Sequence, residues 1–275
     1  MKRLRLEDLL KNTGDMALKR RALNIVKGLN PQFGENILDV GCGDGYYLYL
    51  LSNLDVDIKL FGVDCDREAL RKAKNNLPRK IILKYGDLMT KLPFKSSTFD
   101  KVVISEVLEH LPDENRGLKE VRRVLKKRGV LCVSVPNANY PFFWDPVNWT
   151  LERFFNIHIQ SGFFSGIWNQ HERLYTPDHI KKTVKRAGFK VKQVRPLTWW
   201  CLPFNHYIVN IVARGLAHGS FSVETKKALS KYTKNPKRNF ILNLAFKIVN
   251  VLDKLNDFYS PNNRGVSVFV LACKK

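Results

Sequence analysis

Short apolar runs alternate with amphipathic helical patterns along most of the chain. Runs such as NILDV, KLFGVD and GVLCVSVPN are separated by helical segments such as DREALRKAKNN. This alternation is typical of parallel βαβ units, whose sheet carries helices on both faces. Seven such runs can be identified, so the sequence predicts a doubly wound α/β domain with a mostly parallel, seven-stranded sheet.

Two stretches interrupt the alternation, and both read as insertions. Residues 137–175 are irregular and rich in aromatic side chains, and residues 198–262 lie just before the last apolar run. Basic amphipathic helices are expected at the start of the chain. The predicted organisation is therefore N-terminal helices at 1–35, a core at 36–197 and 263–275 that includes a lid insertion at 137–175, and a helical insertion at 198–262.

Charge and cysteine usage limit the partners and the compartment. The 275 residues carry a formal net charge of +22, with an isoelectric point near 9.9. Such a charge favours nucleic acid, an anionic membrane surface or acidic small molecules as partners. Five scattered cysteines without a CxxC pair suggest reduced thiols in a cytoplasmic protein. The start of the chain lacks the apolar core of a signal peptide, and no run of about 18 apolar residues predicts a bilayer span.

A glycine-rich turn follows the first predicted strand, in the stretch ILDVGCGDGYY. Gly41, Gly43 and Gly45 occupy alternate positions, whereas a dinucleotide-binding G-x-G-x-x-G turn would need a glycine where Tyr46 stands. A bare turn between a strand and a helix allows a ligand to approach the backbone. The carboxylate of Asp39, just ahead of the turn, suits a cationic ligand better than a phosphate.

Two further acids end the next two predicted strands. Asp64 lies about 20 residues beyond the turn, where a carboxylate can accept hydrogen bonds from ribose hydroxyls. Asp87 ends the third strand and could accept from an adenine amino group. Together the turn and the acids predict a site for a nucleoside with a positively charged tail that is not a phosphate.

These motifs, in this order, resemble those of the class I S-adenosylmethionine-dependent methyltransferases, especially the quinone-biosynthesis-like branch. The resemblance rests on DVGCGDG, GVD, GDL, LPFKSSTFDKVVISEVLEHLPD and LKKRGVLCVSVPN. It implies a Rossmann-like fold, S-adenosylmethionine as cofactor, and a glycine turn packed on the methionine part of that cofactor. It further implies the roles of four residues: Asp64 on the ribose, Asp87 on the adenine amino group, Leu88 beside the adenine ring and Ser105 facing the methionine end. Asp44, where the family often has a smaller residue, is expected to point to solvent.

Methyl transfer from a sulfonium is an in-line displacement, so the protein contributes mainly alignment. A base is needed only if the acceptor must lose a proton. His110 and His171 are candidates for that base or for contacts with the acceptor, although each could instead be structural. Glu109 could orient His110 or be solvated. No metal site is predicted, because His158 and His171 have no cysteine or carboxylate partner near them in the sequence.

The aromatic segment 140–168 is expected to form mainly a small core of the lid, with a few side chains lining the acceptor site. In the second insertion, NFILNLAFKIVNVLDKLNDF predicts a helix at 239–258 that is mostly apolar, with a narrow polar stripe of Asn243, Lys247, Asn250 and Lys254. The stretch 206–217 has a similar apolar bias. A wide apolar face flanked by lysines suits a membrane interface, but it also suits burial against the lid or a partner subunit.

Three functions therefore stay open at this level. The first is a methyltransferase for a small-molecule or lipid-linked acceptor, located in the cytoplasm or peripherally at a membrane. The second is an RNA methyltransferase, which the charge would suit. The third is a cofactor-binding regulator without turnover.

Overall fold

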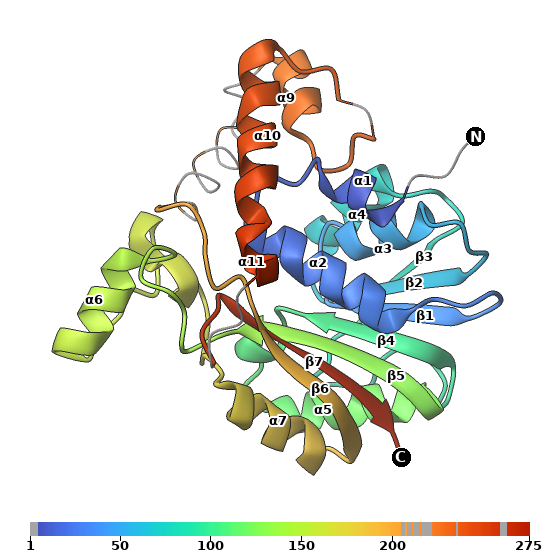
Figure 1. The fold of residues 1–275 in the computed structure, drawn as a ribbon. Helices are drawn as coiled ribbons and strands as arrows, with labels where there is room; N and C mark the ends of the chain where they lie inside the picture. The colour runs from blue at the N-terminus through green and yellow to red at the C-terminus, as the bar shows by residue number, and fades with distance from the viewer. Residues whose placement is uncertain are drawn as a thin grey trace.

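The computed structural model describes residues 5–204, 222–234, 236–258 and 263–275, together with residues 207, 211 and 215. Its centre is one seven-stranded sheet in the order β3-β2-β1-β4-β5-β7-β6 (Figure 1). Neighbouring strands from β3 to β5 pair in parallel, whereas β7 is antiparallel to both β5 and β6. The predicted doubly wound, mostly parallel sheet is confirmed. The strands are β1 Asn36–Val40, β2 Lys59–Asp64, β3 Ile82–Tyr85, β4 Phe99–Ser105, β5 Leu125–Pro136, β6 Phe189–Leu197 and β7 Ser267–Lys274.

Helices cover both faces of the sheet in two apolar layers. The first layer joins α1, α2, α3 and α4 to one face, and the second joins α5 and α7 to the other. The helices are α1 Leu6–Leu10, α2 Met16–Leu29, α3 Tyr46–Ser52, α4 Arg67–Asn76, α5 Glu114–Val124, α6 Pro146–Phe155, α7 Pro177–Arg186, α9 Val223–Leu229, α10 Phe240–Asp253 and α11 Leu255–Phe258. Two 3-10 turns, η1 Leu108–His110 and η2 Phe163–Trp168, complete the described elements.

Two predicted segments differ from the structure. The pattern NRGLKEVRRVLKK predicts a helix that runs through Lys127, but the helix ends at Val124, and residues 125–127 begin β5 instead. Leu125 is fully buried and pairs with Phe99 of β4, so sheet pairing and burial outweigh the helical pattern of the lysines that follow it. The lid is less irregular than its composition suggests. It contains α6, which starts at Pro146 after Asp145 caps it, as Pro at the first helical position allows.

The second insertion is helical where the structure describes it. Helix α10 continues into α11 and stands beside α2, while α9 lies close to its far end (Figure 1). Most of the stretch 206–217 lies outside the described residues. Within the described ranges no helix is both long and apolar enough to traverse a bilayer.

Candidate cofactor and acceptor site

The three glycines of the turn after β1 are not all needed for the same structural reason. All three adopt positive φ, at 68° for Gly41, 52° for Gly43 and 88° for Gly45, a region that glycine enters without steric cost. A side chain on Gly41 would lie 2.3 Å from Val107, and one on Gly45 would lie 2.6 Å from Leu77. Nothing lies within 4 Å of the corresponding position on Gly43. Gly41 and Gly45 are therefore required by packing, and Gly43 provides the open face of the turn.

Asp64 ties the turn to the end of β2. One carboxylate oxygen accepts a hydrogen bond from the Gly43 backbone N–H at 2.7 Å, and the other accepts from the Asp66 N–H at 2.8 Å. On the next strand, the Asp87 carboxylate accepts from the Met89 N–H at 2.8 Å. Because β1, β2 and β3 are parallel neighbours, the turn and both acids share the carboxyl edge of the sheet, where α/β folds bind ligands.

Leu88, expected beside the adenine ring, is buried next to Asp87. Its burial places the backbone that follows β3 against the apolar layer that also contains Val63. This packing fixes the Asp87 turn at the sheet edge.

Asp39 is a buried acid that lacks full compensation. Its side chain is 1% exposed, and the carboxylate oxygen Oδ2 has no hydrogen-bond partner among the described residues. Burial, together with the negative charges of Asp64 and Asp44, raises the pKa of this carboxyl well above its usual value. A cationic group above the turn would relieve this arrangement, and the ammonium group of S-adenosylmethionine is such a group.

Ser105 belongs to a polar chain that the sequence did not reveal. Its hydroxyl lies 2.7 Å from the Tyr47 hydroxyl and 2.8 Å from that of Ser134. Ser134 donates to Glu106 at 2.9 Å, and the Arg21 guanidinium donates to the other Glu106 oxygen at 3.0 Å. Burial raises the pKa of Tyr47 to about 12. The chain therefore connects the ends of β4 and β5 to α2 and α3 directly below the turn.

Glu106 is held in an uncommon backbone conformation. Its φ of 55° lies in the left-handed region, which costs energy for a residue other than glycine. No sequence signal marks it apart from its position directly after β4.

The two candidate histidines lie side by side although they are far apart in the sequence. The end of the lid returns to η1, where the Glu172 N–H donates to the Glu109 carbonyl at 2.9 Å and the Arg173 guanidinium donates to the Leu111 carbonyl at 2.5 Å. As a result the rings of His110 and His171 are 4.8 Å apart and inclined at 67°. The structure therefore brings together both residues that the sequence singled out for contact with the acceptor.

Glu109 completes this group. Its side chain is fully buried, neither carboxylate oxygen has a hydrogen-bond partner in the part of the chain that the structure describes, and Oε1 lies 4.0 Å from the His171 Nε2. Burial, and after it the charge of Glu106, raises the pKa of Glu109 well above its usual range. Of the two roles that the sequence left open, solvation is therefore wrong. His158, the other histidine considered, stacks on Trp168 instead.

Asp44 does not simply point to solvent as expected. Its carboxylate pairs with the Lys231 ammonium at 3.1 Å, and its backbone carbonyl accepts from the Tyr232 hydroxyl at 2.9 Å. Tyr232 also packs edge-on against Tyr46 and Tyr49 of α3. The second insertion thus contacts the glycine turn directly, a contact between segments that no local pattern could indicate.

The lid aromatics are less buried than expected. Tyr140 and Trp144 are buried and contribute to a small apolar cluster with Ile167. The prediction that most of the aromatics are core is nevertheless wrong, because half of them remain exposed. The exposed ones are Phe142, Phe143, Phe154, Phe155 and Phe164.

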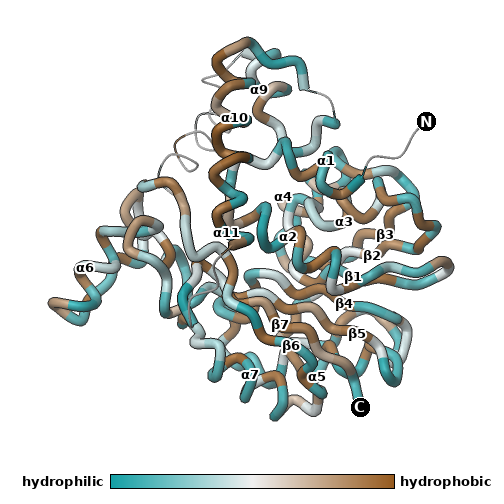
Figure 2. Tube along the Cα trace, viewed as in Figure 1, coloured by the Kyte–Doolittle hydropathy of each residue, from teal (hydrophilic) through white to brown (hydrophobic). Residues whose placement is uncertain are grey.

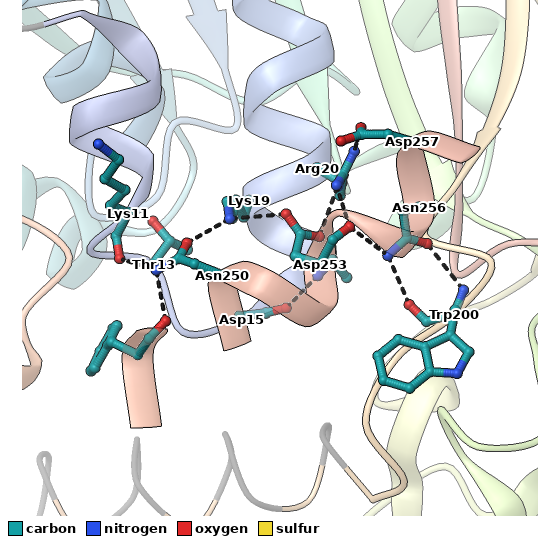
Figure 3. A network of polar contacts seen from close by, with 12 residues as sticks. Lys11, Thr13, Asp15, Lys19, Arg20, Trp200, Asn250, Asp253, Asn256 and Asp257 are labelled. Carbon is teal, nitrogen blue, oxygen red and sulfur yellow. Dashed lines mark hydrogen bonds and ion pairs between the residues drawn. The ribbon is translucent and has the colours of Figure 1, made fainter. Parts of the chain in front are cut away.

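Two polar side chains of α10, Asn250 and Asp253, face inward. Asp253, 3% exposed, pairs with Arg20 at 2.7 Å and with Lys19 at 2.9 Å (Figure 3). Asn250 donates to the Lys11 carbonyl at 3.1 Å and accepts from Lys19 at 2.6 Å. Asn250, which the sequence placed on the narrow polar stripe, therefore faces α2.

Many apolar side chains of α10 and α11 face outward, whereas others, such as Phe246 and Val249, are half-buried. Figure 2 shows that most residues along α10, at the edge of the molecule, are hydrophobic. The exposed residues follow each other at intervals of three and four positions, which places them on one side of a helix. They are Ile241, Leu244, Ile248, Val251, Leu255 and Phe258, with Phe240 at the start. We call this set the outer stripe. Lys247 and Lys254 are also exposed.

The comparisons with known proteins agree on one family. A model described as "Methyltransferase domain" matches residues 38–133. A demethylmenaquinone methyltransferase of Staphylococcus saprophyticus is 31% identical over 185 residues, which cover 63% of this chain and 78% of that protein. A probable S-adenosylmethionine-dependent methyltransferase of Mycolicibacterium smegmatis is 36% identical over 104 residues, or 38% of this chain and 39% of the relative. The match therefore spans well under half of that relative's length.

Solved structures show the same fold. Phosphoethanolamine N-methyltransferase 2 of Haemonchus contortus, determined with S-adenosyl-L-methionine, has a TM-score of 0.56 at 18% identity, covering 92% of this chain and 52% of that one. A possible histamine N-methyltransferase of Thermotoga maritima has a TM-score of 0.55 at 16% identity, covering 93% and 88%.

The turn, the acids at the sheet edge and the strand order define a Rossmann-like methyltransferase core. This chain belongs to the S-adenosylmethionine-dependent methyltransferase family, and demethylmenaquinone methyltransferases are among its relatives. The family and the cofactor predicted from the sequence are both confirmed.

Proposed function

We propose that this protein transfers a methyl group from S-adenosylmethionine to a small, lipid-linked acceptor at an anionic membrane surface. Relatives named as demethylmenaquinone methyltransferase and as O-methyltransferase support a small-molecule acceptor. A cytoplasmic protein that docks reversibly on the membrane is part of this proposal.

The outer stripe is the observation that most supports docking on a membrane. A helix of a globular protein normally buries its apolar side, whereas the one fully buried side chain of α10 is Asp253, and isoleucine, leucine and valine are exposed. Exposed apolar side chains beside lysines are typical of helices that lie in a membrane interface. The net charge of +22 complements an anionic leaflet, and each lysine near it contributes about 1 kcal/mol. A bilayer therefore fits this face in both its apolar and its charged parts.

The core supplies binding and alignment. Bound S-adenosylmethionine provides a methyl group on a sulfonium, which leaves as a thioether without assistance from a base. Gly43 and Asp39 would accept the amino-acid end of the cofactor, and Asp64 and Asp87 its ribose and adenine. His110 and His171 would contact the acceptor, since they lie after β4, next to the strand that leads into the glycine turn.

The cofactor assignment is tested by calorimetry with S-adenosylmethionine. Asp64→Ala should weaken binding by about 1–3 kcal/mol, because hydrogen-bonding groups lose their partner. Asp57→Ala, which changes an exposed acid, is the control and should bind normally. Unchanged affinity in Asp64→Ala would remove Asp64 from the site.

The role of the histidines is tested with labelled cofactor and a lipid extract. His110→Ala or His171→Ala should lose roughly 10²–10⁴ in rate if it assists proton removal, while cofactor binding is retained. Full activity in both variants would leave the reaction to alignment alone.

The membrane part is tested by flotation with vesicles of anionic and of neutral lipid. Ile248→Asp, on the outer stripe, should lose binding to anionic vesicles. Val223→Asp, at an exposed position of α9, is the matched control and should retain it. Phe246 is unsuitable for this test, because its ring lies beneath the Arg238 guanidinium on the inner side of α10.

Two outcomes would contradict docking. The first is wild-type protein that stays in the soluble fraction with anionic vesicles at low salt. The second is wild-type protein that binds RNA but does not float with the vesicles. Dimers that dissociate in Ile248→Asp would show instead that a second copy covers the stripe.

A further inference from the structure

We propose that Glu109, His110 and His171 bind a divalent first-row transition-metal ion at the acceptor side of the site. One ligand atom from each of the three residues lies within 4.8 Å of those of the other two. The three residues come from two segments, η1 and the end of the lid, which are joined by the backbone hydrogen bond from Glu172 to Glu109 and by the Arg173 side chain bonded to the Leu111 carbonyl. Sequence neighbours alone gave no reason to expect a metal here.

The state of Glu109 points to a cation. A carboxylate that is fully buried and accepts no hydrogen bond is costly, because burial of an uncompensated charge must be offset by a partner. No lysine or arginine is paired with Glu109 among the described residues. A metal ion between Glu109 and His171, whose nearest atoms are 4.0 Å apart, would supply the missing positive charge.

The surroundings of the histidines suit ligation. The Nδ1 of His110 lies 2.9 Å from the Gln170 carbonyl, which fixes the proton on Nδ1 and leaves the Nε2 lone pair for a metal. Histidine ligands of metals usually donate their other N–H to such a carbonyl. Glu106 lies nearby, but its two oxygens are bonded to Arg21 and Ser134, so Glu109 is the acid of this group left without a hydrogen-bond partner among the described residues.

The donor set selects the class of ion. Two imidazoles and one carboxylate suit zinc, iron, cobalt, nickel or manganese better than magnesium or calcium, which prefer oxygen ligands. Metal–nitrogen and metal–oxygen bonds of about 2.1 Å place ligand atoms about 3–4 Å apart. The His171 Nε2 and Glu109 Oε1 atoms, 4.0 Å apart, are at this spacing, and the full set, within 4.8 Å, would have to draw together slightly around an ion, with the exposed His110 as the side chain free to move.

Three protein ligands leave positions for the acceptor. An acceptor hydroxyl on the ion would lose its proton to solvent more easily, as metal-bound water does. Its oxygen would then bond to the methyl carbon, and the electron pair of the broken carbon–sulfur bond would stay on sulfur. The site therefore favours an oxygen acceptor, a statement that rests on the proposed methyl transfer, whereas metal binding itself does not.

The experiment uses the full chain without a histidine tag, stripped with a chelator and titrated with Co²⁺ alone. Calorimetry should show one equivalent bound at micromolar concentrations, with visible absorption bands of Co²⁺ coordinated by nitrogen. His171→Ala and the nearly isosteric Glu109→Gln should bind at least tenfold more weakly, while His158→Ala binds as the wild type. Circular dichroism and binding of S-adenosylmethionine confirm that each variant is folded.

Several results would overturn the site. Wild-type protein that binds no Co²⁺, Zn²⁺ or Mn²⁺ at micromolar concentrations would do so, and so would equal losses in His158→Ala and His171→Ala. Methyl transfer that persists without metal binding would reject this site and leave the proposed function intact. Metal binding without any transfer would support the site while rejecting the function.

Discussion

Helices α5 and α10 have similar N-terminal caps, but α5 buries its apolar side whereas the outer stripe of α10 is exposed. Asp113 caps α5 and Asn239 caps α10, each by accepting a backbone N–H three residues on. Leucine and valine of α5 pack into the apolar layer beneath the sheet. On α10 the buried side carries Asp253 and Asn250, and the outer stripe is exposed. Helical periodicity therefore predicts a helix in both cases, but it does not say which side is turned inward.

The largest expected effect comes from a charge on the buried side of α5. Val121 is fully buried, so Val121→Asp places an unpaired carboxylate in the core. We expect the free energy of unfolding to fall by about 4 kcal/mol or more. Urea denaturation measures this change, and a loss below about 1 kcal/mol would show that α5 is not anchored as described.

The buried side of α10 carries the charged Asp253, so removing this charge should destabilise the protein. Asp253→Ala leaves Arg20 and Lys19 without their shared partner in a nearly dry contact. We expect a loss of about 3 kcal/mol and faster proteolysis around α10. Asp257→Ala, whose side chain is 58% exposed, is the control and should change little. Equal behaviour of the two variants would argue against the inward-facing contact.

In contrast to the substitutions above, replacing the buried acid Asp39 should stabilise the protein. Because its pKa is raised, the folded protein keeps a proton that the unfolded chain has lost, and stability falls as pH rises above the ordinary pKa of an aspartate. Asp39→Asn removes this loss and should raise the free energy of unfolding by about 1–2 kcal/mol at pH 7–8. The gain should shrink toward pH 4, and affinity for S-adenosylmethionine should drop. Denaturation at several pH values checks the trend, which a pH-independent difference would contradict.

The smallest expected effect is on the outer stripe. Ile248→Asp exchanges an apolar side chain that is already 47% exposed, so the free energy of unfolding should change by no more than about 0.5 kcal/mol. The same variant should lose vesicle binding. Thermal denaturation without lipid measures the first effect, and a large destabilisation would mean that this side is covered within the protein.

Much of the core could be predicted because its information is local. Most strands from NILDV to SVFVLACKK contain a short apolar run, and the glycine turn with Asp64 and Asp87 lies at strand ends whose positions follow from the alternation. The pairing of His110 with His171 depends instead on how the lid returns to η1. The same is true of the burial of Glu109.

The insertions were harder for a different reason. The orientation of α10 is decided by Arg20 and Lys19, which belong to a helix more than 200 positions earlier in the chain. The lid aromatics share one composition, yet Tyr140 is buried and Phe154 is exposed, because only some of them meet the small cluster around Ile167. Composition alone could not separate the two groups.

In the proposed function, the contact of Lys231 and Tyr232 with Asp44 joins the second insertion, which would dock on a bilayer, to the glycine turn, which would hold the cofactor. Energetic coupling between two ligands is reciprocal: a bilayer that shifts this contact would change the affinity for S-adenosylmethionine by the same factor by which bound S-adenosylmethionine changes the affinity for the bilayer. Membrane docking and loading of the methyl donor would then be linked through a single contact.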